Sequence, residues 1–135
     1  MAARQADITS LRDTNSLALE LADKIAADKP LLLYGDLGAG KTELARAIIK
    51  KLANANEIPS PTFTLVQDYG TVAHFDLYRL KTADEAFELD LDTYIKTRPV
   101  IIEWPQLVED YIAANFAPIK LELKLNGDTR TATFF

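Results

Sequence analysis

A glycine-rich segment, Gly35–Thr42 with the sequence GDLGAGKT, constrains the fold of this chain most strongly. It follows a short apolar run at 31–34 and precedes a helical pattern over about 41–54. The segment matches G-x-x-x-x-G-K-[ST] in full, a pattern whose glycines allow a tight loop that points its N–H groups at phosphate oxygens. We therefore expect nucleotide binding, with Lys41 reaching the β- and γ-phosphates and the Thr42 hydroxyl ligating Mg²⁺.

The rest of the chain alternates between strand and helix patterns. This alternation predicts an α/β sandwich whose mostly parallel central sheet carries antiparallel edge strands. Together with the glycine-rich loop, it indicates a three-layer fold of the P-loop NTPase type. At 135 residues, the chain is expected to form one domain spanning residues 1–135. We expect strands at 7–11, 31–34, 64–69, 71–77, 98–103, 119–125 and 130–135, a first helix with Asp13 as N-cap, and helices at 41–54, 82–89 and 105–114.

Charge and cysteine content exclude several classes of function. The chain has 15 basic and 20 acidic residues, so its net charge is −5, and strong direct binding to nucleic acid is not expected. The absence of cysteine rules out disulfides, zinc–thiolate sites and thiol nucleophiles. The apolar runs are far shorter than the ~20 residues of a membrane-spanning helix. We expect a cytoplasmic protein without a membrane partner.

Two carboxylates follow apolar stretches and are candidates for the acidic partner that a phosphate loop requires. Glu103 ends the run 99–102, and Asp76 ends the mixed segment 72–76. We expect both beside the phosphate loop as catalytic residues together with Lys41. Which of the two orients the attacking water is left open by the sequence.

His74 and Trp104 lie next to these acids in the sequence. For His74, the only histidine, a structural role with a hydrogen-bonded ring is favoured over general-base catalysis. Trp104 fits equally well as a core side chain and as a wall of the nucleotide pocket.

The chain closely resembles the TsaE family, the small ATPases of tRNA threonylcarbamoyladenosine biosynthesis. The likeness extends over essentially the whole chain and includes blocks more specific than the phosphate loop. The matching blocks are residues 35–42, Ser60–Val66 (SPTFTLV) followed by Tyr69, His74–Leu80 (HFDLYRL) and Ile102–Pro105 (IEWP).

The resemblance implies slow ATP hydrolysis that supports a complex of TsaB and TsaD proteins, which modifies tRNA. It implies ATP and Mg²⁺ as ligands, with Thr42 and Glu103 holding the metal and Asp76 near the γ-phosphate. Phosphate contacts are carried over to Leu37, Gly38, Ala39, Gly40, Lys41 and Thr42.

Other carried-over roles are less closely tied to a motif. The segment Ser60–Thr64 resembles a switch-like loop in which Thr62 and Thr64 sense the γ-phosphate, although a proline-stiffened turn explains it equally well. Arg79 would pair with a partner or with phosphate. Asp13 and Arg130 are our candidates for adenine contacts. The sequence departs from the family at Glu43, where a second threonine is common, and at Asp90, where glycine is common.

Three other functions compete with the ATPase. A small-molecule kinase also uses a phosphate loop, but the chain has no insertion long enough for an obvious arginine-bearing lid. A GTP-dependent switch would need an Asn-Lys-x-Asp loop, and no Asn here precedes Lys. An adaptor that binds nucleotide without hydrolysing it stays open. No arginine finger is obvious in the chain, so basal hydrolysis is expected to be slow.

Overall fold

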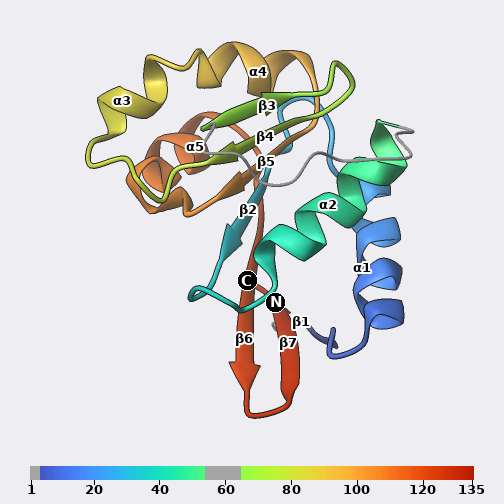
Figure 1. Ribbon diagram of the computed structural model, residues 1–135. Helices are drawn as coiled ribbons and strands as arrows, with labels where there is room; N and C mark the ends of the chain where they lie inside the picture. Colours follow the sequence, from blue (N-terminus) through green and yellow to red (C-terminus); the bar gives the residue numbers. More distant parts are fainter. Residues whose placement is uncertain (1–3, 54–64) are drawn as a thin grey trace.

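The computed structural model describes residues 4–53 and 65–135. In this part of the chain, seven strands form one mixed sheet in the order β1-β7-β6-β2-β5-β4-β3 (Figure 1). The strands are β1 (Arg4–Asp7), β2 (Leu31–Tyr34), β3 (Val66–Asp68), β4 (Ala73–Asp76), β5 (Val100–Glu103), β6 (Ile119–Asn126) and β7 (Thr129–Phe134). The helices are α1 (Leu11–Lys24), α2 (Lys41–Leu52), α3 (Ala83–Phe87), α4 (Leu91–Thr97), the 3₁₀ turn η1 (Pro105–Leu107) and α5 (Glu109–Asn115).

The sheet is parallel at its centre and antiparallel at both edges. Strands β6, β2, β5 and β4 run parallel, while β3 pairs antiparallel with β4, and β7 pairs antiparallel with both β6 and β1. The expected α/β fold is therefore confirmed. The narrower assignment to the P-loop NTPase type stays a prediction.

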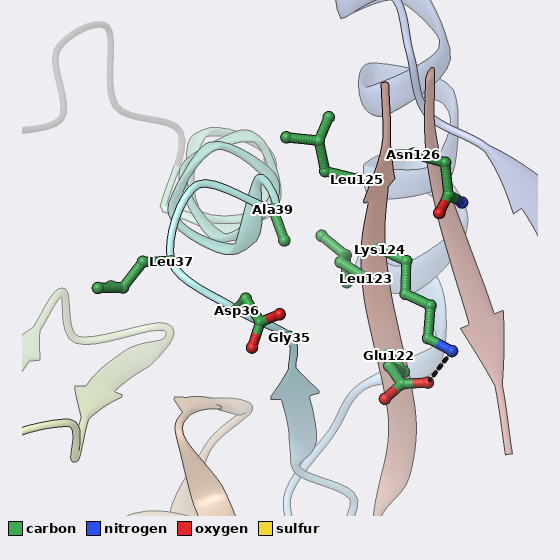
Figure 2. Close-up of a pocket in the computed structure, with 9 residues that line it drawn as sticks. All are labelled: Gly35, Asp36, Leu37, Ala39, Glu122, Leu123, Lys124, Leu125 and Asn126. Atoms are coloured by element: carbon green, nitrogen blue, oxygen red, sulfur yellow. Dashed lines mark ion pairs between the residues drawn. The ribbon is translucent and has the colours of Figure 1, made fainter. Parts of the chain in front are cut away.

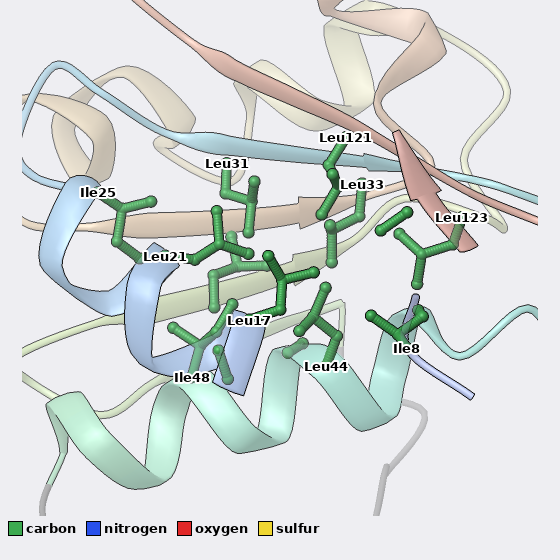
Figure 3. Close-up of a cluster of buried hydrophobic side chains, with 14 of the residues drawn as sticks. Ile8, Leu17, Leu21, Ile25, Leu31, Leu33, Leu44, Ile48, Leu121 and Leu123 are labelled. Atoms are coloured by element: carbon green, nitrogen blue, oxygen red, sulfur yellow. The ribbon is translucent and has the colours of Figure 1, made fainter. Parts of the chain in front are cut away.

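Strand β2 is buried on both faces because each of its four side chains is apolar and the pleat sends them alternately to opposite sides. Leu31 and Leu33 join a cluster with α1 and α2, which is drawn in Figure 3. Leu32 and Tyr34 join a second cluster with α3, α4 and α5. Helices therefore cover both faces of the sheet, and β2 is packed between two hydrophobic cores.

The start of the chain differs from the prediction. Strand β1 ends at Asp7, so the expected strand at 7–11 is wrong, and the predicted N-cap at Asp13 is also wrong. Ser10 is the N-cap of α1, and its hydroxyl accepts a hydrogen bond from the Asp13 N–H at 3.0 Å. Asp13 lies in the first turn, where its charge favours the helix dipole.

The segment between α3 and α5 also contains features that were not predicted. Helix α4 begins after Asp90, whose φ of 60° and ψ of 33° lie in the left-handed region. Glycine adopts that conformation without strain, whereas a residue with a Cβ adopts it at some cost. The expected helix at 105–114 is divided into η1 and α5, and Trp104 precedes η1 with a φ of 57°.

Over the described residues, the other predicted strands and helices agree with the structure within a few residues. The capping box at Thr82 and Glu85 is present at the start of α3. The segment Ser60–Thr64, which was predicted to form a switch-like loop with Thr62 and Thr64, lies outside the described residues. In the described ranges, the helices are too short or too polar to span a membrane.

Candidate active site

The glycine-rich loop leaves the centre of the sheet between β2 and α2. Gly35 begins it with a φ of 141°, a conformation that side chains rarely adopt. A Cβ at this position would lie 2.5 Å from the carbonyl oxygen of Leu123 in β6. Gly35 is therefore required both for the turn and for the close approach of the loop to the neighbouring strand.

Helix α2 presents its N-terminus to this loop. Gly40 is the N-cap, with a φ of 102°, and has no side chain to accept from the first N–H groups of the helix. Those N–H groups have no intrahelical acceptor, and the helix dipole adds positive potential at the same place. The arrangement suits an anion. The N–H of Ala39 is already bonded to the Asp36 carbonyl at 3.1 Å, so that group closes the loop.

Lys41 is buried, with 5% of its surface exposed. Its Nζ donates to the carbonyl of Gly35 and lies 3.5 Å from both the Asp36 carbonyl and the centre of the Trp104 ring. Burial lowers the pKa of Lys41, and the neighbouring acids Glu103, Asp76 and Asp36 oppose that shift. The ammonium therefore lies at the base of the loop among carboxylates.

Glu103 is also buried, with 2% of its surface exposed. It ends β5 and lies in register with Leu33 of β2, so its side chain points to the α2 face of the sheet. One carboxylate oxygen accepts the Thr42 hydroxyl at 3.0 Å, and the other lies 2.6 Å from Nε2 of His74. The expected hydrogen bond of the His74 ring is thus present, and its partner is the candidate metal ligand.

Asp76 ends β4 directly beside Glu103, because β4 and β5 are parallel and the two residues are in register. Its carboxylate accepts the N–H of Tyr78 at 3.1 Å, which bends the chain after the strand. Asp76 is half-buried, whereas Glu103 is enclosed. The two acids therefore differ in access to solvent although they occupy equivalent strand ends.

These groups line one pocket of about 260 Å³ at the N-terminus of α2. Carboxylates and cations meet there, since Asp76, Glu103 and Glu43 face Lys41 and Arg130. The other lining residues are Leu37, Gly38, Gly40, Thr42, Tyr78 and Trp104. The pocket thus combines a helix N-terminus that suits an anion with an excess of acidic side chains that suits a cation. This combination suits an anion that binds together with a cation.

The donor set fits Mg²⁺. Thr42 and Glu103 offer hard oxygen donors 3.0 Å apart. In the described part of the chain, no group of three or more acidic or histidine side chains forms a complete metal cage. Mg²⁺ needs no such cage, because it usually keeps several waters and takes one or two protein oxygens together with substrate phosphates.

Comparison with known proteins then decides the family. The family model described as threonylcarbamoyl adenosine biosynthesis protein TsaE matches residues 8–132. The chain belongs to the TsaE family. It is 36% identical over 131 residues to the tRNA threonylcarbamoyladenosine biosynthesis protein TsaE of Rickettsia bellii, a match that covers 93% of this chain and 90% of the relative.

Two further matches support the family and the fold. The chain is 34% identical over 142 residues to the protein of the same name from Mycobacterium tuberculosis, covering 96% of this chain and 84% of the relative. The structure reported as "Crystal structure of Bacillus subtilus YdiB" superposes with a TM-score of 0.74 at 24% identity, over 98% of this chain and 84% of that one. This last likeness shows a shared fold.

Of the three remaining candidate residues from the TsaE resemblance, one lines the pocket and two do not. Arg130 lines the pocket and pairs with Glu43 at 3.1 Å, so the residue that departs from the family pattern is held by the candidate adenine contact. Asp13 does not line the pocket. Arg79 is exposed and also lies outside its lining. The roles of these three residues stay predictions.

A second pocket of about 390 Å³ lies between the loop and β6 (Figure 2). Ala39 and Asp36 form its loop wall, and β6 forms the opposite wall, where Glu122 and Lys124 are 3.6 Å apart. It is larger than the first pocket. It does not contain the lysine, threonine and acidic groups that converge at α2, so the smaller pocket is the better candidate site.

Sequence reasoning missed one residue that lines the site and one contact within it. Tyr78 packs on Trp104, with ring centroids 4.7 Å apart, and both line the pocket. Trp104 is therefore a pocket wall and not a core side chain. The contact between His74 and Glu103 was also missed, although the alternation of His74, Phe75 and Asp76 along one strand already placed the first and third on the same face.

Proposed function

We propose that this chain is an ATPase that binds Mg-ATP and hydrolyses it slowly in support of a tRNA threonylcarbamoyladenosine-modifying complex. One observation carries the proposal: Lys41, Thr42, Asp76 and Glu103 converge on one pocket at the N-terminus of α2. Membership of the TsaE family supplies the biological process.

The contacts support a division of roles between the two acids. Both oxygens of Glu103 already have hydrogen-bonding neighbours in Thr42 and His74, so this carboxylate is fixed in place and suits holding the metal with Thr42. Asp76 is more accessible and suits orienting the attacking water. When bound, Mg²⁺ neutralises charge on the phosphates.

Lys41 and the N–H groups of the loop would stabilise charge on the phosphoryl oxygens. Phosphoryl transfer depends mainly on positioning and on such charge stabilisation. The ammonium of Lys41 would have to leave the carbonyl of Gly35 to contact a phosphate. The protein then supplies preorganised charge, and no covalent intermediate with the chain is needed.

Slow hydrolysis follows from the cations that the pocket contains. Of the described residues lining it, only Lys41 and Arg130 are cationic, and Arg130 is paired with Glu43. Among these described lining residues no unpaired arginine is left to stabilise the transition state, a contribution worth about 10³–10⁵ in kcat in related reactions. We infer that a protein complex of the TsaB and TsaD type completes or assembles the site. The net charge of −5 favours a protein partner over direct binding of tRNA.

The test is the rate of ATP hydrolysis by the chain alone and with the partner complex. Lys41→Ala is expected to abolish hydrolysis in both conditions, while Lys124→Ala, in the second pocket, is expected to leave both rates unchanged. Equal rates for Lys41→Ala and wild type would refute the site. Nucleotide-dependent binding to the partners without hydrolysis would favour an adaptor, and tighter binding of GTP than of ATP would refute the adenine assignment.

A further inference from the structure

The Glu103 carboxylate is held from two sides. The Thr42 hydroxyl approaches one oxygen at 3.0 Å from the start of α2, and His74 Nε2 approaches the other at 2.6 Å from β4. The His74 side chain is 11% exposed and that of Glu103 is 3% exposed, so water competes little for either group. A buried hydrogen bond to a charged group is among the stronger ones in proteins.

The sheet register produces this contact. His74 pairs with Ile101 across the parallel strands β4 and β5, and Glu103 lies two residues further along β5 on the same face. The two side chains are therefore diagonal neighbours under α2. Because β4 also ends in Asp76, a single strand supplies one acid of the site and the hydrogen-bond donor that holds the other.

We propose that His74 is a positioning residue for the metal site, which fixes the rotamer of Glu103 so that the oxygen nearest Thr42 faces Mg²⁺. This inference rests on the proposed function. His74 does not line the pocket, so it would act through the Glu103 carboxylate. Groups that orient a metal ligand typically change metal affinity by 10–100-fold when they are removed.

A purely structural histidine would behave differently. Its loss would weaken the fold and every form of ligand binding together. Loss of a positioning residue would spare binding of ATP without metal, which depends on Lys41 and the loop, and would weaken only the gain in affinity that Mg²⁺ provides.

The experiment measures ATP affinity with Mg²⁺ and with EDTA in the intact chain. Trp104 is the only tryptophan and lines the pocket beside Lys41, so its fluorescence reports binding, with calorimetry as an independent check. His74→Phe keeps a ring without a donor, and His74→Ala removes the ring. His74→Gln restores an N–H donor. Val72→Ala is the matched control, since Val72 is buried just before the same strand in the α1 and α2 cluster and does not bond Glu103.

We expect His74→Phe and His74→Ala to bind ATP in EDTA within about twofold of wild type and to lose at least about tenfold of the Mg²⁺-dependent gain. His74→Gln should recover most of that gain, and Val72→Ala should keep it while lowering the urea midpoint. An unchanged gain in both donor-free variants, an equal loss in Val72→Ala, or no recovery in His74→Gln would overturn the inference. If wild type itself shows no affinity for ATP, the proposed function fails instead.

Discussion

Replacing Gly35 with alanine tests whether the root of the phosphate loop is fixed by its contact with β6. Gly35 has a φ of 141°, and an added Cβ would lie 2.5 Å from the carbonyl oxygen of Leu123. That oxygen belongs to the backbone of a paired strand, so it cannot move aside as the end of a side chain would. Gly127 provides a matched control, because its φ is 62° but no atom lies within 4 Å of its added Cβ.

The two substitutions separate backbone strain from steric overlap. A residue forced into a sparsely populated region of φ and ψ costs about 1–3 kcal/mol, and forcing extra volume into a packed site costs about 1–3 kcal/mol more. Gly35→Ala is therefore expected to lose about 2–6 kcal/mol of unfolding free energy. Gly127→Ala incurs only the left-handed strain of about 1–2 kcal/mol.

Urea unfolding followed by circular dichroism, without nucleotide, gives both free energies. The expected result is a loss for Gly35→Ala that exceeds that of Gly127→Ala by at least about 1 kcal/mol. Equal losses would refute the reasoning, since they would mean that β6 yields freely to the new side chain and does not fix the loop.

Two further predictions concern the helices. The Arg4 guanidinium and the Lys24 ammonium lower the pKa of Glu20 from 4.5 to about 2, so these ion pairs stabilise the fold above pH 4.5 and their contribution is lost as the pH falls towards 2. Glu20→Gln should therefore lower the free energy of unfolding by about 0.5–1 kcal/mol at pH 7 and by progressively less in acid. A difference in urea unfolding that does not change with pH would contradict this. Thr82→Ala removes the capping box of α3, in which the Thr82 hydroxyl accepts from the Glu85 N–H at 3.4 Å. The free energy of unfolding should fall by about 0.5–2 kcal/mol. An unchanged midpoint in thermal or urea unfolding would count against the cap.

Much of the candidate site could be predicted because its parts are local in sequence or share an edge of the sheet. The loop 35–42 carries its own motif, and Asp76 and Glu103 end parallel strands, whose carboxyl ends meet at the same edge. The bond from His74 to Glu103 could not be predicted in the same way. It depends on the register of β4 against β5, which side chains on both strands set together.

The errors in the fold have similar causes. Ser10 and Asp13 are both good N-cap residues, and contacts distant in sequence decide between them. The Ile8 N–H bonds the carbonyl of Arg130 in β7, which fixes where the first strand ends and the helix begins. Helix α4 has only two fully buried apolar side chains, Leu91 and Ile95, so the sequence contains too few apolar repeats to recognise a helical pattern there.

Strand β2, which carries the loop, has a mechanical consequence for ligand binding. Its side chains are locked into both hydrophobic cores, so displacing it would disturb the packing of every helix layer at once. Any adjustment to a bound phosphate chain would then occur beyond the strand and beyond Gly35, within residues 36–40, of which 36–38 are exposed. A rearrangement on ligand binding would then be confined to a short segment above a rigid strand.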